Sequence, residues 1–230
     1  MKIGIIVAMR KELDLLLEII KNKTEETSNG YDIYSGTIGN HQVFAMQCGI
    51  GKVNAAIGTM SLIDKYCPEM IINTGVAGGA NKNIRQMDIV VGEKIAYHDV
   101  WCGPGTPYGE ASGYPLFFNS SQDILNLLKH INANENENII FGLICSGDKF
   151  IASEQEVEEI ASKFPEVSAV DMESASIAQV CYLKKVPVFV MRVISDTPGS
   201  NNDNTSQYEN FWESAPKHTF ATLTKILTKL

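Results

Sequence analysis

The chain of 230 residues lacks the residue patterns that build metal centres and disulfide frameworks. Its four histidines are scattered, and none stands in a His-x-x-x-His or Cys-His spacing. Its five cysteines are widely spaced, and no Cys-x-x-Cys occurs. Zinc sites and disulfide-stapled domains depend on such spacings. We therefore expect no metal ion, no cofactor and a reducing, cytoplasmic setting.

Long apolar stretches and an excess of positive charge are also missing. No run of about 18 apolar residues is present, so the sequence predicts no membrane-spanning helix. The apolar start Ile3–Met9 is closed by Arg10 and Lys11 without a cleavage site, which argues against a signal peptide. With 19 basic and 27 acidic side chains the net charge is −8. An acidic chain suits neither nucleic acid nor an anionic membrane, so we expect neither partner.

The residues that are present are typical of one globular domain over residues 1–230, with 44% apolar and 20% charged. Apolar runs of strand length predict strands at Lys2–Met9, Tyr31–Ile38, His41–Cys48, Glu69–Thr74, Asp88–His98, Ile139–Ser146 and Pro187–Ile194. Helical patterns lie between them, at Arg10–Lys21, Lys52–Tyr66, Gln122–Ile131, Glu154–Lys163, Ser174–Leu183 and Tyr208–Leu230.

This alternation predicts the fold class α/β, as a three-layer αβα sandwich with a central mixed β-sheet. The sheet is expected to be mixed because Gly39-Asn40 predicts a tight hairpin between two alternating segments. Two stretches, Asp99–Ser120 and Thr197–Gln207, are long and irregular. Such loops are either functional or simply mobile, and the sequence leaves both readings open.

Acids and glycines follow the predicted strands, at the edge where ligands bind in open α/β sheets. Glu12, Glu173 and Asp196 each come soon after an apolar run. Two separated carboxyl groups, one acid and one base, are the standard equipment for hydrolysing a glycosidic bond. The same carboxylates also fit helix N-terminal caps. Gly75–Gly79 lacks the terminal Lys-Ser/Thr of a P-loop, and it is read either as a tight turn or as backbone that a ligand approaches closely.

Seven segments together resemble one family, and they span nearly the whole chain in the family's order. They are Met1–Ile6, Ala8-Met9 with Glu12, Gly49–Ala56, Ile71–Gly79, Ser146–Asp148 with Phe150-Ile151, Asp171–Ala175 and Arg192–Asp196. The chain resembles the bacterial 5′-methylthioadenosine/S-adenosylhomocysteine nucleosidases of the purine nucleoside phosphorylase/hydrolase superfamily. The resemblance implies a phosphorylase/hydrolase-like fold. It also implies an N-glycosyl hydrolase that releases adenine and a 5-thio-substituted ribose from methylthioadenosine, S-adenosylhomocysteine or both.

The resemblance also implies roles for the three acids. Asp196 would be the general acid that protonates adenine at N7, and it must carry a proton at that moment. Glu12 would be the base that activates the attacking water. Glu173 would bind the ribose 2′- and 3′-hydroxyls, a contact that can strengthen as the sugar gains positive charge.

Residues around the base and ribose are implied in the same way. Phe150 would stack on adenine, and Ile151 would read the purine edge through its backbone. Ala77 and Gly78 would lie in the loop that closes over the base and sugar, and Met172 would pack under the ribose.

Five further residues complete the implied site. Arg192 and Ser195 would support the water and Asp196. Met9, Ile50 and Tyr208 would line an apolar pocket for the 5′ group, which in the family is partly built by the second subunit of a homodimer.

Departures from the family pattern and rival functions remain. Val76 stands where many relatives carry Ser or Thr, leaving its N–H to hold the water. A phosphorolytic purine nucleoside phosphorylase is disfavoured because Asn73-Thr74 replaces an expected arginine, although Arg10 and Arg85 keep it open. A non-catalytic adenine-nucleoside-binding protein is the other alternative. The sequence does not rank methylthioadenosine, S-adenosylhomocysteine, 5′-deoxyadenosine and an aminodeoxyfutalosine-like nucleoside.

Overall fold

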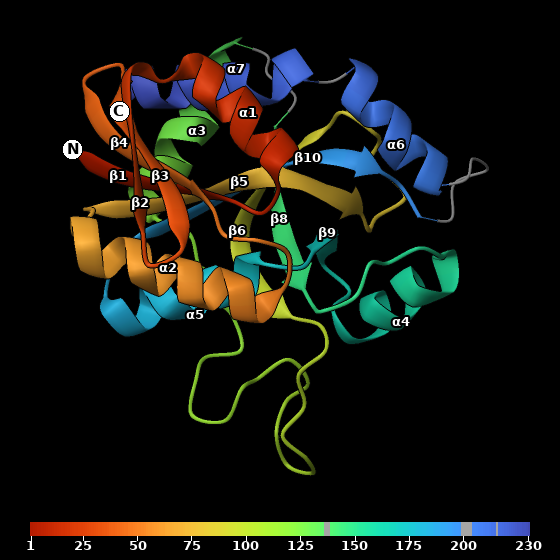
Figure 1. Ribbon diagram of the computed structural model, residues 1–230. Coiled ribbons are helices and arrows are strands. Elements are labelled where there is room, and N and C mark those ends of the chain that lie inside the picture. Colours follow the sequence, from red (N-terminus) through yellow and green to blue (C-terminus); the bar gives the residue numbers. More distant parts are fainter. Residues whose placement is uncertain (136–138, 199–203, 215) are drawn as a thin grey trace.

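The computed structural model describes residues 1–135, 139–198, 204–214 and 216–230 (Figure 1). Its strands are β1 Lys2–Val7, β2 Lys21–Ser28, β3 Tyr31–Ile38, β4 His41–Gln47, β5 Met70–Gly79, β6 Ile89–Tyr97, β7 Phe118–Asn119, β8 Ile139–Ser146, β9 Val167–Asp171 and β10 Val188–Asp196. Its helices are α1 Arg10–Ile19, α2 Lys52–Tyr66, α3 Gln122–Glu135, α4 Glu154–Lys163, α5 Ser174–Lys184, α6 Asn204–Ser214 and α7 Pro216–Lys229.

The strands form one mixed sheet in the order β10-β6-β8-β9-β5-β1-β4-β3-β2, with β7 beside β6. Strand β1 pairs in parallel with β4 and β5, whereas β2–β3 and β3–β4 pair antiparallel. The expectation of a mixed α/β fold is confirmed. Strand β5 also pairs with β10, so the strands β5, β10, β6, β8 and β9 close into a ring. The expected three-layer sandwich is not confirmed, because a closed ring is not a flat middle layer.

Helices cover the two faces of the open part of the sheet (Figure 1). Helices α1 and α7 contact each other and strands β4 and β3, while α2 contacts β1, β4 and helix α5. Strand β1 serves both faces, because its side chains alternate. Ile3 and Ile5 pack in the apolar core beneath α1 and α7, and Ile6 packs in the core beneath α2. Gly4 lies where any side chain would overlap Leu62 of α2, so it allows α2 to approach closely.

The short strands β7 and β9 were not predicted, and three further elements differ from the sequence prediction. Strand β2 was missed because its residues are polar and almost all exposed, as befits the edge of a sheet. Strand β5 does not end in a turn after Thr74 but continues through Gly79, paired with β10. The single helix expected over Tyr208–Leu230 is two helices, and the second begins at Pro216, a residue that suits a first helical position.

The two long loops have different outcomes. Between β6 and β7 the chain projects from the body beyond α2 and α5 (Figure 1). Of the stretch Thr197–Gln207, residues 199–203 lie outside the described residues, and α6 begins at Asn204. In the part of the chain that the structure describes, no helix is both long enough and apolar enough to cross a membrane.

Candidate active site

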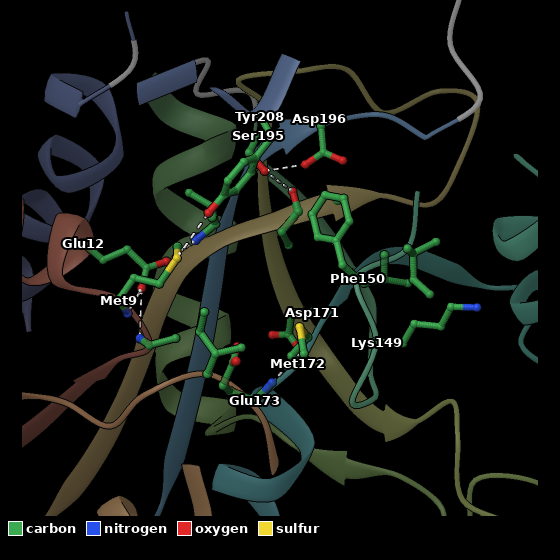
Figure 2. Close-up of a pocket in the computed structure, with 17 residues that line it drawn as sticks. Met9, Glu12, Lys149, Phe150, Asp171, Met172, Glu173, Ser195, Asp196 and Tyr208 are labelled. Carbon is green, nitrogen blue, oxygen red and sulfur yellow. Dashed lines mark hydrogen bonds between the residues drawn. The ribbon is translucent and has the colours of Figure 1, made fainter. Parts of the chain in front are cut away.

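A cavity of about 170 Å³ opens where strands β1, β5, β9 and β10 end (Figure 2). The residues that line it are Ala8, Met9, Glu12, Ile50, Val76, Ala77, Gly78, Lys149, Phe150, Ile151, Val170, Asp171, Met172, Glu173, Ser195, Asp196 and Tyr208. Every site residue expected from the sequence is in this set except Arg192. Segments from both ends of the chain therefore meet at one edge of the sheet, as expected for a ligand site in this class of fold.

Glu12 lies on the first turn of α1 and is only 3% exposed. Its Oε2 accepts the N–H groups of Ala8 and Met9, each at 2.9 Å, and its Oε1 accepts the N–H of Val76 at 3.0 Å. Burial raises the pKa of this carboxyl, while the charge of Arg192 and the three N–H groups oppose the rise. Glu12 thus caps the N-terminus of its own helix, and it also faces the cavity. The Val76 N–H, expected to hold a water molecule, is instead bound to Glu12.

Gly75 explains why the glycine segment stands beside Glu12. Its φ is +146°, and a side chain there would overlap the Glu12 carboxylate. A larger residue would push the carboxylate out of its place. Close approach between backbone and a functional group, rather than a tight turn, therefore accounts for this glycine.

Glu173 follows β9 and stands at the start of α5, where it is 6% exposed. Its Oε1 accepts the N–H of Gly51 at 2.8 Å, at the N-terminus of α2. Burial, followed by the negative charge of Asp171, raises the pKa of Glu173 to about 7. The Gly51 N–H and Arg192 oppose that rise. The carboxyl is therefore able to gain or lose a proton near neutral pH.

Asp196 ends β10 and is 2% exposed. The Ser195 hydroxyl donates a hydrogen bond to Asp196 Oδ1 at 2.6 Å. The pairing of β10 with β5 is irregular between Ile194 and Asp196, and such an irregularity re-aims side chains. Both Ser195 and Asp196 consequently line the cavity. Glu12, Glu173 and Asp196 enter it from three different directions (Figure 2).

The apolar wall joins residues from both ends of the chain (Figure 2). Phe150 is 46% exposed and meets the Tyr208 ring edge to face, with centroids 5.9 Å apart. The Tyr208 hydroxyl donates to Met9 Sδ at 3.2 Å. Ile50 is half-exposed at the rim, and Ile151 is buried. An aromatic face and a flexible thioether suit a flat base and an alkylthio group.

Arg192 lies beneath the cavity rather than on its surface, and it is 2% exposed. Its Nε donates to Asp171 Oδ2 at 2.9 Å, and its Nη2 donates to Asn73 Oδ1 at 2.5 Å. The expected support of the water and of Asp196 stays a prediction. The buried carboxylate of Asp171 needs a charged partner, and the guanidinium of Arg192 is that partner.

The predicted site did not include four of the lining residues, Ala8, Lys149, Val170 and Asp171. Val76 was expected at the site only through its N–H. Asp171 offered a signal, since it is an acid at a strand end. Lys149 forms an ion pair with Glu156 at 2.5 Å and stands next to Phe150. Among the described residues, no group of three or more His, Cys, Asp or Glu side chains is arranged to hold a metal ion.

Known proteins resemble the whole chain. The model of the phosphorylase superfamily matches residues 2–228. A 5′-methylthioadenosine/S-adenosylhomocysteine nucleosidase from Haemophilus influenzae (strain PittEE) is 38% identical over 231 residues, covering 100% of both chains.

Solved structures agree with this likeness. The nucleosidase of the same name from Streptococcus pneumoniae, solved with the transition-state inhibitor MT-ImmA, is 35% identical with a TM-score of 0.93 over 99% of each chain. The futalosine hydrolase of Helicobacter pylori is 29% identical with a TM-score of 0.92, over 100% of this chain and 98% of that one. The resemblance found in the motifs is confirmed: the chain belongs to the phosphorylase superfamily and, within it, to the 5′-methylthioadenosine/S-adenosylhomocysteine nucleosidase family.

Proposed function

We propose that this chain is an N-glycosyl hydrolase that acts on 5′-methylthioadenosine, S-adenosylhomocysteine or both, releasing adenine and the 5-thio-substituted ribose. The observation that carries the proposal is the convergence of Glu12, Glu173 and Asp196 on one cavity with an aromatic wall. Full-length relatives of this name support it. Paired carboxyl groups on either side of a glycosidic bond are the usual apparatus for such hydrolysis.

Each acid is proposed to have a distinct task. Asp196 gives a proton to adenine N7, so that a neutral base leaves, and the Ser195 hydroxyl fixes one of its oxygens. Glu12 takes a proton from the attacking water. Its burial supports this role, because a raised pKa makes a carboxylate a stronger base. Glu173, which accepts the Gly51 N–H at the N-terminus of α2, binds the ribose 2′- and 3′-hydroxyls.

The neighbouring residues are proposed to bind the rest of the nucleoside. Phe150 stacks on adenine and Ile151 borders the purine edge, with Ala77 and Gly78 on the β5 side and Met172 under the ribose. Met9, Ile50 and Tyr208 receive the 5′ group; the contact between Met9 and Tyr208 supports this grouping.

Phosphorolysis finds little support in the arginines. Arg192 is buried in an ion pair, Arg10 pairs with Asp14 on the surface, and Arg85 lines a different cavity. Among the described residues that line the candidate site, Lys149 is the one cation, and it already pairs with Glu156. Phosphate would therefore find no cluster of cations beside the ribose.

The experiment is adenine release from methylthioadenosine in phosphate-free buffer. We expect turnover without phosphate and free 5-thio-substituted ribose as the product. Strict phosphate dependence with a ribose 1-phosphate product would instead establish a phosphorylase. Saturable binding with no turnover would establish a binding protein. The same assay with S-adenosylhomocysteine, 5′-deoxyadenosine and an aminodeoxyfutalosine-like nucleoside ranks these substrates by their 5′ substituent.

A homodimer is also proposed, on the basis of an apolar stripe along α2. Val53, Ile57 and Met60 follow helical spacing and are 68%, 55% and 36% exposed. The stripe continues to Ile50 at the cavity rim, so a second copy packed there would complete the 5′ wall. Light scattering of the wild type and of Ile57→Glu tests this, since a charge in the stripe should give monomers.

Three further proposals concern the domain organisation, the location and the layers of the fold. Residues 1–230 form one domain, because the family model runs over nearly all of them. A cytoplasmic location is supported by the five free cysteines. The layered description applies to the part of the sheet around β1 and β4, where α1 and α2 contact the sheet from different sides.

A further inference from the structure

A cluster of polar side chains is buried at and beneath the floor of the cavity, which Asp171 also lines. It comprises Asn73, Asp171, Ser174 and Arg192, and we call it the inner cluster. The side chains of Asp171 and Arg192 are each 2% exposed. A buried ion pair is costly to form, and removing one partner destabilises the fold strongly. The proposed mechanism gives Asp171 no task.

Asp171 accepts an unusual number of hydrogen bonds. Its Oδ1 accepts the Ser146 hydroxyl at 2.5 Å and the N–H groups of Glu173 and Ser174 at 3.3 and 3.2 Å. Its Oδ2 accepts Arg192 Nε at 2.9 Å and the Ser174 hydroxyl. The Ser174 hydroxyl in turn accepts Arg192 Nη2 at 2.9 Å. One carboxylate thus joins the ends of β8 and β9 and the middle of β10 to the start of α5.

Two of these donors fix the backbone at Glu173, because Asp171 accepts the N–H groups of Glu173 itself and of Ser174. The Glu173 side chain extends the other way, to the N–H of Gly51. We propose that Asp171 is a positioning residue that, paired with Arg192, fixes the start of α5 and so sets where Glu173 stands and how it is charged. This inference rests on the proposed function, in which Glu173 binds the ribose.

The charges around Glu173 determine in which direction each substitution should shift its pKa. The titratable and charged groups that face it are Glu12 of α1, Cys48 after β4, Asp171 of β9, Arg192 of β10 and Tyr208 of α6. Burial and neighbouring acids raise the pKa of the Cys48 thiol to about 12, and the Tyr208 pKa is also raised, so both stay neutral near pH 7.

The charges of Asp171 and Arg192 act in opposite directions on the pKa of Glu173, which is about 7. Asp171 raises this pKa, and Arg192 lowers it. Neutralising Asp171 should lower this pKa, because a repelling negative charge disappears. Removing Arg192 should raise it, because an attracting positive charge disappears. A purely structural role predicts lost activity in both variants without opposite shifts.

The test compares Asp171→Asn and Arg192→Met with the control Asp64→Asn, which neutralises an exposed acid on α2. The readouts are the pH profile of kcat/KM for adenine release and a ¹³C titration of the glutamate carboxyls, with Glu173→Gln assigning the signal. We expect the acid limb and the Glu173 titration to fall by about one pH unit in Asp171→Asn and to rise by about as much in Arg192→Met. Asp64→Asn should leave both in place.

Shifts in the same direction, or none, would overturn the proposal. The carboxyl titration needs no turnover, so it still tests the pair if the wild type releases no adenine, the result that would instead remove the proposed function. Ser174→Ala, which removes only the bridging hydroxyl, serves where a charge variant fails to fold. We expect its kcat/KM to fall about three- to tenfold, and an unchanged kcat/KM would count against the inference.

Discussion

Two polar clusters flank Glu173, and they differ mainly in their access to water. The inner cluster is buried and reaches Glu173 through its backbone N–H. The outer cluster, Lys52, Asp99 and Asp148, has side chains that are 24% to 46% exposed. It stands beside the Gly51 N–H that binds Glu173 Oε1.

The difference shows which contacts are able to hold a site rigidly. Arg192 and Asp171 are held by several other buried groups, so neither has a solvated alternative. Lys52 Nζ contacts Asp99 at 2.7 Å and Asp148 at 3.9 Å, but water competes for all three. We infer that the inner cluster fixes Glu173 more firmly than the outer cluster does.

The largest effect is expected where a carboxylate in the cavity meets the reacting groups. Glu12→Gln removes the proposed base and Asp196→Asn the proposed acid, so each should lower kcat by about 10²- to 10⁴-fold. Asp99→Asn, an equal change on the outer side, should stay within about twofold of the wild type. Steady-state adenine release measures all three. Near-normal kcat in Glu12→Gln or Asp196→Asn would reject that residue's role.

A second comparison replaces one cation from each cluster by methionine. Arg192→Met leaves Asp171 buried without its partner, so the free energy of unfolding should fall by about 3–5 kcal/mol. Lys52→Met removes two ion pairs that water already weakens, and the loss should stay below about 1 kcal/mol. Urea denaturation of both variants measures the two losses in the free energy of unfolding. Equal losses would show that burial does not distinguish the clusters.

Much of the site is predictable because strand ends of a parallel sheet meet at one edge. Glu12, Glu173 and Asp196 are far apart in the sequence, yet each follows a strand and each lines the cavity. Arg192 is four residues before Asp196 and in a regular strand would share its face. The irregular pairing after Ile194 breaks that alternation, and this irregularity depends on contact with β5, which the sequence of β10 does not display.

The fold shows the same limit. Apolar runs such as Lys2–Val7 predict buried strands because burial on both faces requires apolar side chains throughout. Strand β2 has no such run, and it exists only because β3 offers an edge to pair with. Gly75 to Gly79 read as a turn because glycine favours turns, but β10 and Glu12 require an extended backbone there.

A smaller effect is expected on the aromatic side of the cavity. Phe150→Leu keeps an apolar side chain but removes the ring proposed to stack on adenine. Base stacking on an aromatic ring contributes about 1–3 kcal/mol, so KM should rise about tenfold with little change in kcat. Phe164→Leu serves as the control, because that ring is buried in an apolar cluster and does not line the cavity. Unchanged KM and kcat in Phe150→Leu would reject the stacking role.

The smallest effect is expected at Asp148, which caps α2 from another element. Gly51 begins α2 without a side chain, and Asp148 Oδ1 accepts the Lys52 N–H at 2.7 Å in its place. Asp148→Ala removes this acceptor, so unfolding should cost about 1 kcal/mol less and KM should rise less than about threefold. Asp148→Asn keeps an oxygen and loses only the charge, so it should match the wild type in urea denaturation and in KM. Equal losses in both variants would mean that the ion pairs with Lys52, rather than the cap, hold the outer side in place.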